Sequence, residues 1–291
     1  MRILVSGQNG QLGRALLSQA NQIHDFPYFD LREINFLDQD QLFRSVESLR
    51  PEALINTAAF TDVDNAETQI ELATNLNSLF PANLAKICKH LEIPFYQIST
   101  DYVFSGLSNS PWQVNSPTNP INVYGATKLA GEKSVSELCP QEFRIFRTSW
   151  LYSRFRKNFA KTMVRFALED EQNINVVSDQ IGQPTSAIDL AKQLIQALEM
   201  SLKPGIYHAT NSGSTTWYEF AKEIFDLLGE DSNRVLPVKS SDFKRLAVRP
   251  TYSVLSHDCW LKSGLVPMRD WKSAIVDTIE GIKTAVISEG V

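Results

Sequence analysis

Residue types that define several protein classes are scarce in this sequence. Its three cysteines, Cys88, Cys139 and Cys259, are widely spaced and odd in number, so neither a disulfide framework nor a cysteine-based zinc site is predicted. The four histidines lie far apart and form no pair of metal ligands. We therefore expect no bound metal.

Long apolar runs and clusters of basic residues are also missing. No apolar run reaches the roughly 18 residues that span a bilayer, and a strand-like segment directly after Met1 leaves no room for a signal peptide. The 28 lysines and arginines are scattered and the net charge is -5, which argues against a nucleic-acid-binding surface. The sequence thus predicts a cytoplasmic protein that binds neither membranes nor nucleic acids.

Strand-like and helical segments alternate through the first half of the chain. The predicted strands are residues 2–6, 26–31, 53–59, 95–99 and 144–150. This alternation predicts an α/β protein with a Rossmann-type, doubly wound parallel sheet. After Trp150 the rhythm changes, with helices expected near residues 155–168, 185–198, 216–228 and 270–286 and extended segments at 173–178 and 205–209.

These patterns suggest how the chain is divided. We expect residues 1–152 to form a dinucleotide-binding domain, completed by parts of 180–205, and residues 153–291 to form a smaller, mainly substrate-binding α/β part. No linker or repeat separates them, so both should pack as one globular unit. In the second part, Thr216 is expected to cap a helix whose apolar stripe, including Trp217, Phe220 and Phe225, belongs to the core.

A glycine loop follows the first predicted strand. Residues 2–6 run directly into Gly7-Gln8-Asn9-Gly10-Gln11-Leu12-Gly13 and then into helical residues. Glycines allow positive φ and let the backbone approach a pyrophosphate, while the helix N-terminus offers free N–H groups. The spacing is GxxGxxG and not the common GxGxxG, but its place between a strand and a helix predicts dinucleotide binding.

The next strand should carry residues that choose the cofactor. Asp30 lies about 17 residues beyond Gly13, where an acidic residue commonly bonds a ribose 2′-hydroxyl and favours NAD. The neighbouring Arg32 would instead meet the 2′-phosphate of NADP, so the choice stays open. Asn35 and Phe36 follow, and they either line an adenine pocket or anchor the loop.

Small or polar residues gather where the later strands end. Ala58, Ala59, Phe60 and Thr61 follow the third predicted strand, Ser99-Thr100-Asp101 ends the fourth, and Trp150 ends the fifth. Ligands of open α/β sheets sit beyond the carboxyl ends of strands. These residues are therefore candidates for contacts with a cofactor and a substrate.

Tyr124 and Lys128 stand four residues apart on the helix that follows. This spacing puts both side chains on one face, about one turn apart, so the ammonium can lie near the phenol. A fixed cation favours phenolate, so we expect the tyrosine pKa to fall from about 10 toward the range of proton transfer at neutral pH. Tyr-x-x-x-Lys is common by chance, and its meaning depends on the rest of the chain.

Several longer strings resemble one enzyme family. The glycine loop, the strand-end Thr100 and Tyr-x-x-x-Lys together resemble the extended short-chain dehydrogenase/reductase superfamily. The match narrows to the dTDP-4-dehydrorhamnose reductase family through Ser99-Thr100-Asp101-Tyr102-Val103-Phe104, through residues 122–132, and through Arg249-Pro250-x-Tyr252-Ser253. The resemblance covers nearly the whole chain, and these strings are more specific than the glycine loop.

The resemblance implies an activity and a set of site residues. It implies reduction of the C4 ketone of dTDP-4-dehydro-L-rhamnose, a dTDP-linked 4-keto-6-deoxyhexose, with NADPH or NADH. Tyr124 would be the acid, both Tyr124 and Lys128 would lie at the nicotinamide ribose, and Lys128 would also tune Tyr124. Thr100 would bond the carbonyl oxygen, while Thr100, Asp101 and Trp150 would face the sugar. The dinucleotide would lie across residues of the glycine loop and of the later loops: Gly7, Asn9, Gly10, Gln11, Leu12, Gly13, Asp30, Asn35, Phe36, Ala58, Ala59, Phe60 and Thr61.

Two departures from the family pattern and two rival functions remain. Asn35 stands where the family often has Asp, and Ala15 stands where members with a metal-bridged dimer have Glu, so the resemblance implies no metal here, although a homodimer stays open. One rival is a sister reductase that makes another deoxysugar, such as dihydrostreptose or 6-deoxytalose. The other is a non-catalytic, cofactor-binding subunit related to the partner of methionine adenosyltransferase, which the presence of Thr100, Tyr124 and Lys128 disfavours.

Overall fold

A parallel sheet forms the centre of the molecule in the computed structural model, which describes residues 1–19, 24–28, 34–169 and 172–290. Its strands are β1 (Ile3–Ser6), β2 (Ala53–Asn56), β3 (Phe95–Thr100), β4 (Phe143–Thr148) and β9 (Gly205–His208), hydrogen-bonded in the order β1-β2-β3-β4-β9. The predicted α/β fold class with a parallel sheet is confirmed. Strand β9 comes from the second half of the chain and pairs with β4.

The chain changes direction across the sheet next to β1. Residues 25–28 form parallel bridges with the free edge of β1, through Arg2 with Asp25 and Val5 with Tyr28, whereas β2 lies on the opposite edge of β1. The carboxyl ends of β1 and β2 therefore border the switch point at which open α/β sheets bind ligands. The remainder of the strand predicted at 26–31, with Asp30 and Arg32, lies outside the described residues.

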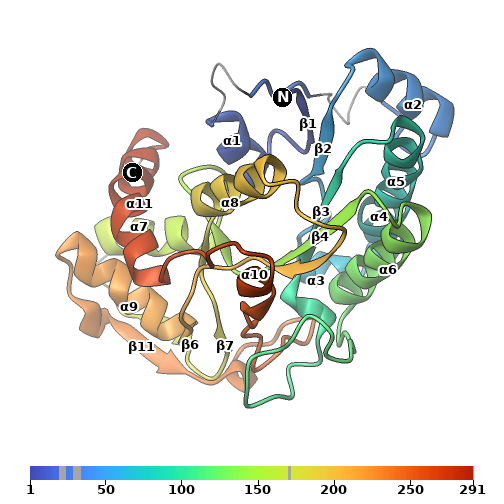
Figure 1. The fold of residues 1–291 in the computed structure, drawn as a ribbon. Coiled ribbons are helices and arrows are strands. Elements are labelled where there is room, and N and C mark those ends of the chain that lie inside the picture. The colour runs from blue at the N-terminus through green and yellow to red at the C-terminus, as the bar shows by residue number, and fades with distance from the viewer. Residues whose placement is uncertain (20–23, 29–33, 170–171, 291) are drawn as a thin grey trace.

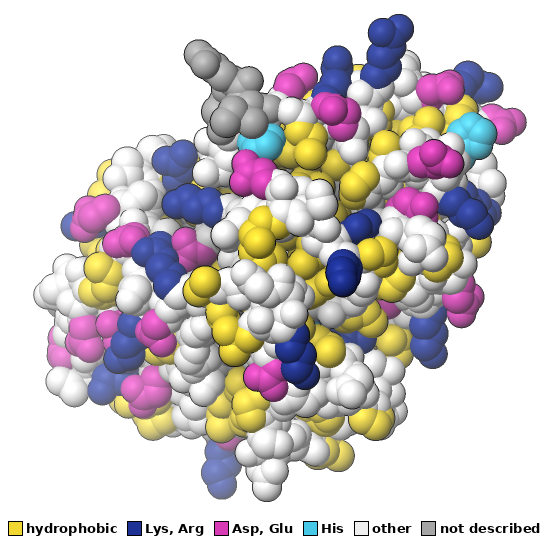
Figure 2. All heavy atoms as spheres, in the orientation of Figure 1, with side chains coloured by type: hydrophobic (Ala, Val, Ile, Leu, Met, Phe, Trp, Pro, Cys, Tyr) yellow, Lys and Arg dark blue, Asp and Glu magenta, His cyan; other side chains and the backbone are white. Residues whose placement is uncertain are grey.

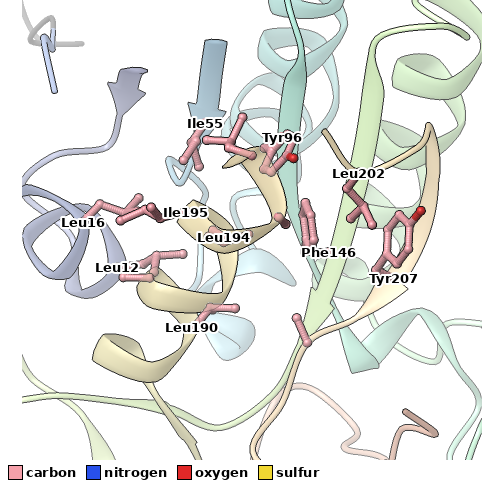
Figure 3. Close-up of a cluster of buried hydrophobic side chains, with 14 of the residues drawn as sticks. Leu12, Leu16, Ile55, Tyr96, Phe146, Leu190, Leu194, Ile195, Leu202 and Tyr207 are labelled. Carbon is pink, nitrogen blue, oxygen red and sulfur yellow. The ribbon is translucent and has the colours of Figure 1, made fainter. Parts of the chain in front are cut away.

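Helices cover both faces of the sheet (Figure 1). One face carries α1 (Gln11–Leu17) and α8 (Ala187–Glu199), and the other carries α2 (Gln39–Ser48), α5 (Phe80–Leu91) and α6 (Val123–Leu138). Alternation along β1 explains this arrangement, because Ile3 and Val5 pack toward α1 and α8 whereas Leu4 packs toward α2 and α5. Figure 3 shows leucines of α1 and α8 meeting Ile55, Tyr96 and Phe146 of the sheet.

The second part of the chain has its own buried cluster. It is built from α7 (Phe159–Glu169), α9 (Trp217–Leu228) and α11 (Trp271–Ser288), with β6 (Ile174–Val177) parallel to β11 (Val235–Val238). Thr216 caps α9 as predicted, since its hydroxyl accepts the Glu219 N–H at 3.0 Å. Phe220 and Phe225 are fully buried, which confirms most of the predicted stripe, while Trp217 is only partly buried.

Short elements connect these two parts. Two small sheets pair β5 (Leu151–Tyr152) with β8 (Thr185–Ser186) and β7 (Ile181–Gly182) with β10 (Thr215–Thr216). The remaining α-helices are α3 (Val63–Ala66), α4 (Ile70–Thr74) and α10 (Asp258–Lys262); Asn75–Leu79 forms a π-helical turn, and residues 101–103, 232–234 and 240–242 form 3₁₀ turns.

In the parts of the chain that the structure describes, no helix has the length and apolar character needed to cross a membrane. Acidic and basic side chains are interspersed on the face drawn in Figure 2.

Candidate active site

The glycine loop between β1 and α1 is held by two close backbone contacts. Gly7 has φ 79°, and a Cβ there would lie 2.6 Å from the Ala58 nitrogen and 2.7 Å from the Thr57 hydroxyl oxygen. A Cβ on Gly13 would overlap the carbonyl oxygen of Gly7. These two glycines are therefore required by the packing of the loop against β2 and α1.

Gly10 differs from Gly7 and Gly13, because the space next to its Cα is nearly empty. It is the N-cap of α1 with φ -77° and ψ 176°, makes no side-chain cap, and its N–H donates to the Gly7 carbonyl at 2.9 Å. A Cβ on Gly10 would meet only the Gly7 oxygen, at 3.2 Å, within 4 Å. Because Gly10 has no side chain, a ligand can approach the backbone N–H groups at the start of α1. This arrangement suits the pyrophosphate of a dinucleotide.

The other predicted residues of the loop contribute in unequal ways. Leu12 is 4% exposed and belongs to the core under α1, so only its backbone can face a ligand. The Gln11 side chain donates to the Leu151 carbonyl at 3.2 Å and accepts from the Ser153 hydroxyl at 2.9 Å. It therefore ties the loop to the chain just after Trp150, while Asn9 is exposed.

The loop after β2 lies beside the glycine loop. Ala58 donates its N–H to the Asn56 side chain at 3.1 Å, which ends β2 at Asn56 and not at the predicted residue 59. Ala59 and Phe60 are partly exposed and Thr61 is exposed. Asn77, which the sequence analysis did not single out, clamps Phe60 by bonding its N–H at 2.9 Å and its carbonyl at 3.1 Å. Its position in a π-helical turn, a rare conformation common at functional sites, is visible only in the structure.

Asn35 and Phe36 form the loop before α2. The Asn35 side chain accepts the Leu37 N–H at 3.2 Å, and Phe36 packs edge-on against Phe80 at 5.3 Å between ring centroids. Asn83 donates to the Phe36 carbonyl at 3.3 Å. These contacts anchor the loop, and Asn35 remains exposed to meet a ligand.

Thr100 and Asp101 lie at the carboxyl end of β3 and are 3% and 2% exposed. The Thr100 hydroxyl donates to the Asp101 carboxylate at 3.0 Å and accepts the Tyr102 N–H at 3.2 Å. Burial raises the pKa of Asp101 to about 7, although hydrogen bonds from Ser253 and Thr100 oppose this rise. The Asp101 carboxyl group is therefore buried next to the Thr100 hydroxyl.

Tyr124 lies in the first turn of α6, which Asn122 caps by accepting the Gly125 N–H at 2.8 Å. Burial of the phenol raises the pKa of Tyr124 to about 12, while a hydrogen bond with Thr100 lowers it. The expected lowering of the Tyr124 pKa is therefore wrong, because burial of the phenol raises it. At neutral pH Tyr124 is a protonated phenol, which is the form that can give a proton away.

Lys128 follows one turn later and is 3% exposed. Its Nζ donates to the Ile98 carbonyl at 2.6 Å, which uses one of the three donors of a lysine. Burial lowers the pKa of Lys128 to about 8, and the negative charge of Glu132 opposes this. The structure thus brings Thr100, Tyr124 and Lys128 together at one end of β3, as the sequence predicted.

Trp150 adopts an unusual backbone conformation at the end of β4, with φ 44°. Its indole stacks on Trp217, with ring centroids 3.5 Å apart and planes 8° apart. A Cβ on Gly182 would lie 2.5 to 2.8 Å from three atoms of the same ring. The face that meets Trp217 is not available to a sugar, so any contact of Trp150 with a substrate uses the rest of the ring. Sequence reasoning placed Trp217 in the core, and its distance from Trp150 along the chain concealed this pair.

This arrangement combines an open glycine loop with a proton donor, a hydroxyl and a buried cation. Such a set can hold a dinucleotide, polarise a carbonyl group and protonate its oxygen. Among the residues that the structure describes, no group of three or more His, Cys, Asp or Glu is placed to hold a metal ion.

Comparisons with known proteins agree with this chemistry. The family model described as the RmlD substrate binding domain matches residues 1–284. The dTDP-4-dehydrorhamnose reductase of Streptomyces griseus is 40% identical, with 97% of this chain and 94% of the relative covered. The dTDP-4-keto-6-deoxy-D-glucose reductase of Streptomyces niveus is 39% identical, with 94% and 95% covered. The crystal structure of a Bacillus anthracis dTDP-4-dehydrorhamnose reductase in complex with NADP superposes with a TM-score of 0.89 at 38% identity, covering 99% of both chains. The chain therefore belongs to the RmlD family of NAD(P)-dependent dTDP-4-keto-sugar reductases.

Proposed function

We propose that this chain reduces the C4 ketone of dTDP-4-dehydro-L-rhamnose to give dTDP-L-rhamnose for cell-surface polysaccharide such as lipopolysaccharide O-antigen. The observation that carries the proposal is the grouping of Thr100, Tyr124 and Lys128 at the end of β3, in a sheet whose glycine loop leaves room at Gly10. When bound, NADPH or NADH supplies the hydride.

The residues of the chain supply the proton and the geometry. Tyr124 gives its phenolic proton to the ketone oxygen, which gains negative charge as its bond to C4 becomes single. The raised pKa keeps Tyr124 protonated until that moment. Thr100, which shares a hydrogen bond with Tyr124, directs the ketone oxygen toward the phenol. A positioned acid of this kind contributes roughly 100- to 10,000-fold to the rate.

The cofactor and the sugar would occupy neighbouring regions. Amides of the glycine loop hold the pyrophosphate, Ala58 to Thr61 border the middle of the dinucleotide, and Lys128 holds the ribose next to the reacting ring. Asp101 and Trp150 line the sugar side together with Thr100. NADPH and NADH both remain open, because Asp30 and Arg32 lie outside the described residues.

A sister reductase is the second candidate. The Streptomyces niveus relative, named for dTDP-4-keto-6-deoxy-D-glucose, is nearly as similar as the Streptomyces griseus enzyme, so similarity does not select the sugar. The non-catalytic subunit is less well supported, because the acid, the hydroxyl and the lysine are all retained. A cytoplasmic location and a homodimer stay predictions.

One experiment separates these candidates. The purified chain is incubated in parallel with dTDP-4-keto-6-deoxy-L-mannose and with dTDP-4-keto-6-deoxy-D-glucose, each with NADPH and with NADH, and products are identified by NMR. We expect the L-mannose compound to be reduced fastest and to give dTDP-L-rhamnose. Faster reduction of the D-glucose compound, or a product with the other configuration at C4, would instead support the sister reductase.

A further inference from the structure

Glu132 lies one helical turn beyond Lys128 on the same face of α6. Tyr124, Lys128 and Glu132 are spaced four residues apart, which places their side chains in one row along the helix. Glu132 is 3% exposed, and charged residues are almost never buried to this extent unless they are paired. The partners of its carboxylate therefore indicate what it does.

Three hydrogen bonds hold the Glu132 carboxylate. Oε1 accepts from the Ser99 hydroxyl at 2.5 Å and from Arg147 Nε at 2.9 Å, and Oε2 accepts from Arg147 Nη2 at 2.7 Å. Ser99 and Arg147 are register partners on β3 and β4. One carboxylate thus connects α6 to both strands, directly next to Thr100.

Arg147 is itself held in place on its other side. It is 2% exposed, its Nη1 donates to the Val114 carbonyl at 3.1 Å, and its guanidinium lies 5.0 Å from the centre of the Phe104 ring. These contacts leave the bidentate pair little freedom to move, so Glu132 has a fixed position relative to β3.

Stability alone does not explain this buried pair. Removing two charges from water costs about as much as their attraction returns, and apolar residues of similar volume often serve as well or better. The pair instead has a specific neighbour, because Lys128 is buried one turn away and the Glu132 charge opposes the loss of its proton. A neutral Lys128 would lack one N–H donor and its charge.

We infer that Glu132 is a positioning residue of this reductase site, which keeps the Lys128 ammonium charged and keeps α6 in register with Thr100. The inference rests on the proposed contact of Lys128 with the dinucleotide. Besides Lys128, α6 carries the titratable groups Tyr124 and Glu132, and elements that pack against α6 carry Asp101 and Tyr102, in the turn after β3, and Arg147, on β4. Of these, Glu132 is the group whose charge acts on the Lys128 pKa.

The test replaces the pair as a whole. Glu132→Gln alone would leave the Arg147 charge buried without a partner, which destabilises a protein in itself, so the variant combines Glu132→Gln with Arg147→Met. Ser99→Ala is the matched control, since it removes one hydrogen bond from the same carboxylate but leaves both charges. Circular dichroism and thermal unfolding establish that each variant is folded, and calorimetry then gives the Kd of NADPH and NADH from pH 6 to pH 10.

We expect affinity for the dinucleotide to fall with rising pH as Lys128 loses its proton. In the double variant the midpoint of this fall should lie at least about one pH unit below that of wild type, while affinity at pH 6 stays within about threefold. Ser99→Ala should keep the wild-type midpoint. An unchanged midpoint in the double variant, or an equal loss of affinity at every pH, overturns the inference.

Lys128→Met distinguishes a failure of this inference from a failure of the proposed function. If that variant loses the pH dependence and the double variant keeps it at the wild-type midpoint, only the role of Glu132 is refuted. If Lys128→Met binds the dinucleotide with the wild-type affinity and pH profile, the proposed contact of Lys128 is refuted as well.

Discussion

Replacing Gly10 by valine should remove cofactor binding and leave the fold intact. The backbone at Gly10 is extended, with φ -77° and ψ 176°, a conformation that valine adopts readily. The new Cβ would meet only the Gly7 oxygen, at 3.2 Å. We therefore expect the free energy of unfolding to stay within about 1 kcal/mol of wild type, helped by the lower entropy of the unfolded chain.

The expected loss of binding follows from what the side chain blocks. A valine at this position keeps a pyrophosphate away from the N–H groups at the start of α1, and two hydrogen bonds to a charged group are worth about 1.5 kcal/mol each or more. That loss corresponds to roughly a hundredfold in Kd.

Thermal unfolding with and without dinucleotide measures this difference. A ligand at about 100 times its Kd stabilises the native state by about 2.7 kcal/mol. With an unfolding entropy of about 2.1 cal/mol/K per residue, the 291 residues should show a rise in Tm of about 4 °C in wild type. At the same dinucleotide concentration the Gly10→Val variant should rise by less than about 1 °C.

Gly13→Ala provides the contrasting control. Its Cβ would overlap the Gly7 oxygen, and overpacking of this kind costs about 1–3 kcal/mol, so the unliganded Tm should fall by several degrees. If Gly10→Val lowers the unliganded Tm as much as Gly13→Ala does, or keeps the full shift with dinucleotide, our account of the loop is wrong.

Three further predictions address single side chains. Tyr124→Phe should keep the fold and the dinucleotide Kd but lower kcat by about 100-fold or more, and turnover of the ketosugar at the wild-type rate would leave the proposed mechanism without its acid. Burial raises the folded-state pKa of Asp101 to about 7, so the wild-type protein loses stability as pH rises from about 4 to 7. In urea unfolding, the free energy of unfolding of Asp101→Asn should rise relative to wild type over this range and level off above it, whereas a difference that stays constant with pH would contradict the raised pKa. The Asp64 carboxylate accepts hydrogen bonds from Arg249 at 2.8 and 3.1 Å and from the Ala247 N–H at 3.0 Å, and these bonds lower its pKa to about 2. Because about a third of its side chain is exposed, Asp64→Asn should lower the free energy of unfolding by only about 1 kcal/mol at pH 7, and this difference should disappear as pH falls from about 4 toward 2.

Local patterns were sufficient for much of this fold. Runs such as Ala53–Asn56 and Phe95–Thr100 are apolar and bounded by turn residues, so their strands follow from short-range preferences. The spacing of Tyr124 and Lys128 likewise needed only the geometry of a helix. The strands at 144–150 and 205–209 were also predicted, but their pairing was not, because sheet neighbours are chosen by contacts far apart along the chain.

The properties of the site that depend on burial could not be predicted from the sequence. Burial of the phenol raises the pKa of Tyr124, which is opposite to the lowering expected from the spacing of Tyr124 and Lys128. The Gln11 side chain bonds Leu151 and Ser153, so the predicted contact of Gln11 with the cofactor would use its backbone. Neither result can be obtained from spacing, since both depend on which segments meet in three dimensions.

The place of β9 in the sheet affects how the protein can be made. During synthesis, β1 to β4 leave the ribosome long before residues 205–208, so β4 remains an open edge with unpaired N–H and C=O groups next to Phe146. Open edges of this kind invite pairing with other chains. A fragment that ends at residue 152 would keep that edge permanently, and we expect it to aggregate on expression, whereas a chain that extends through α8 and β9 covers the edge with its own backbone.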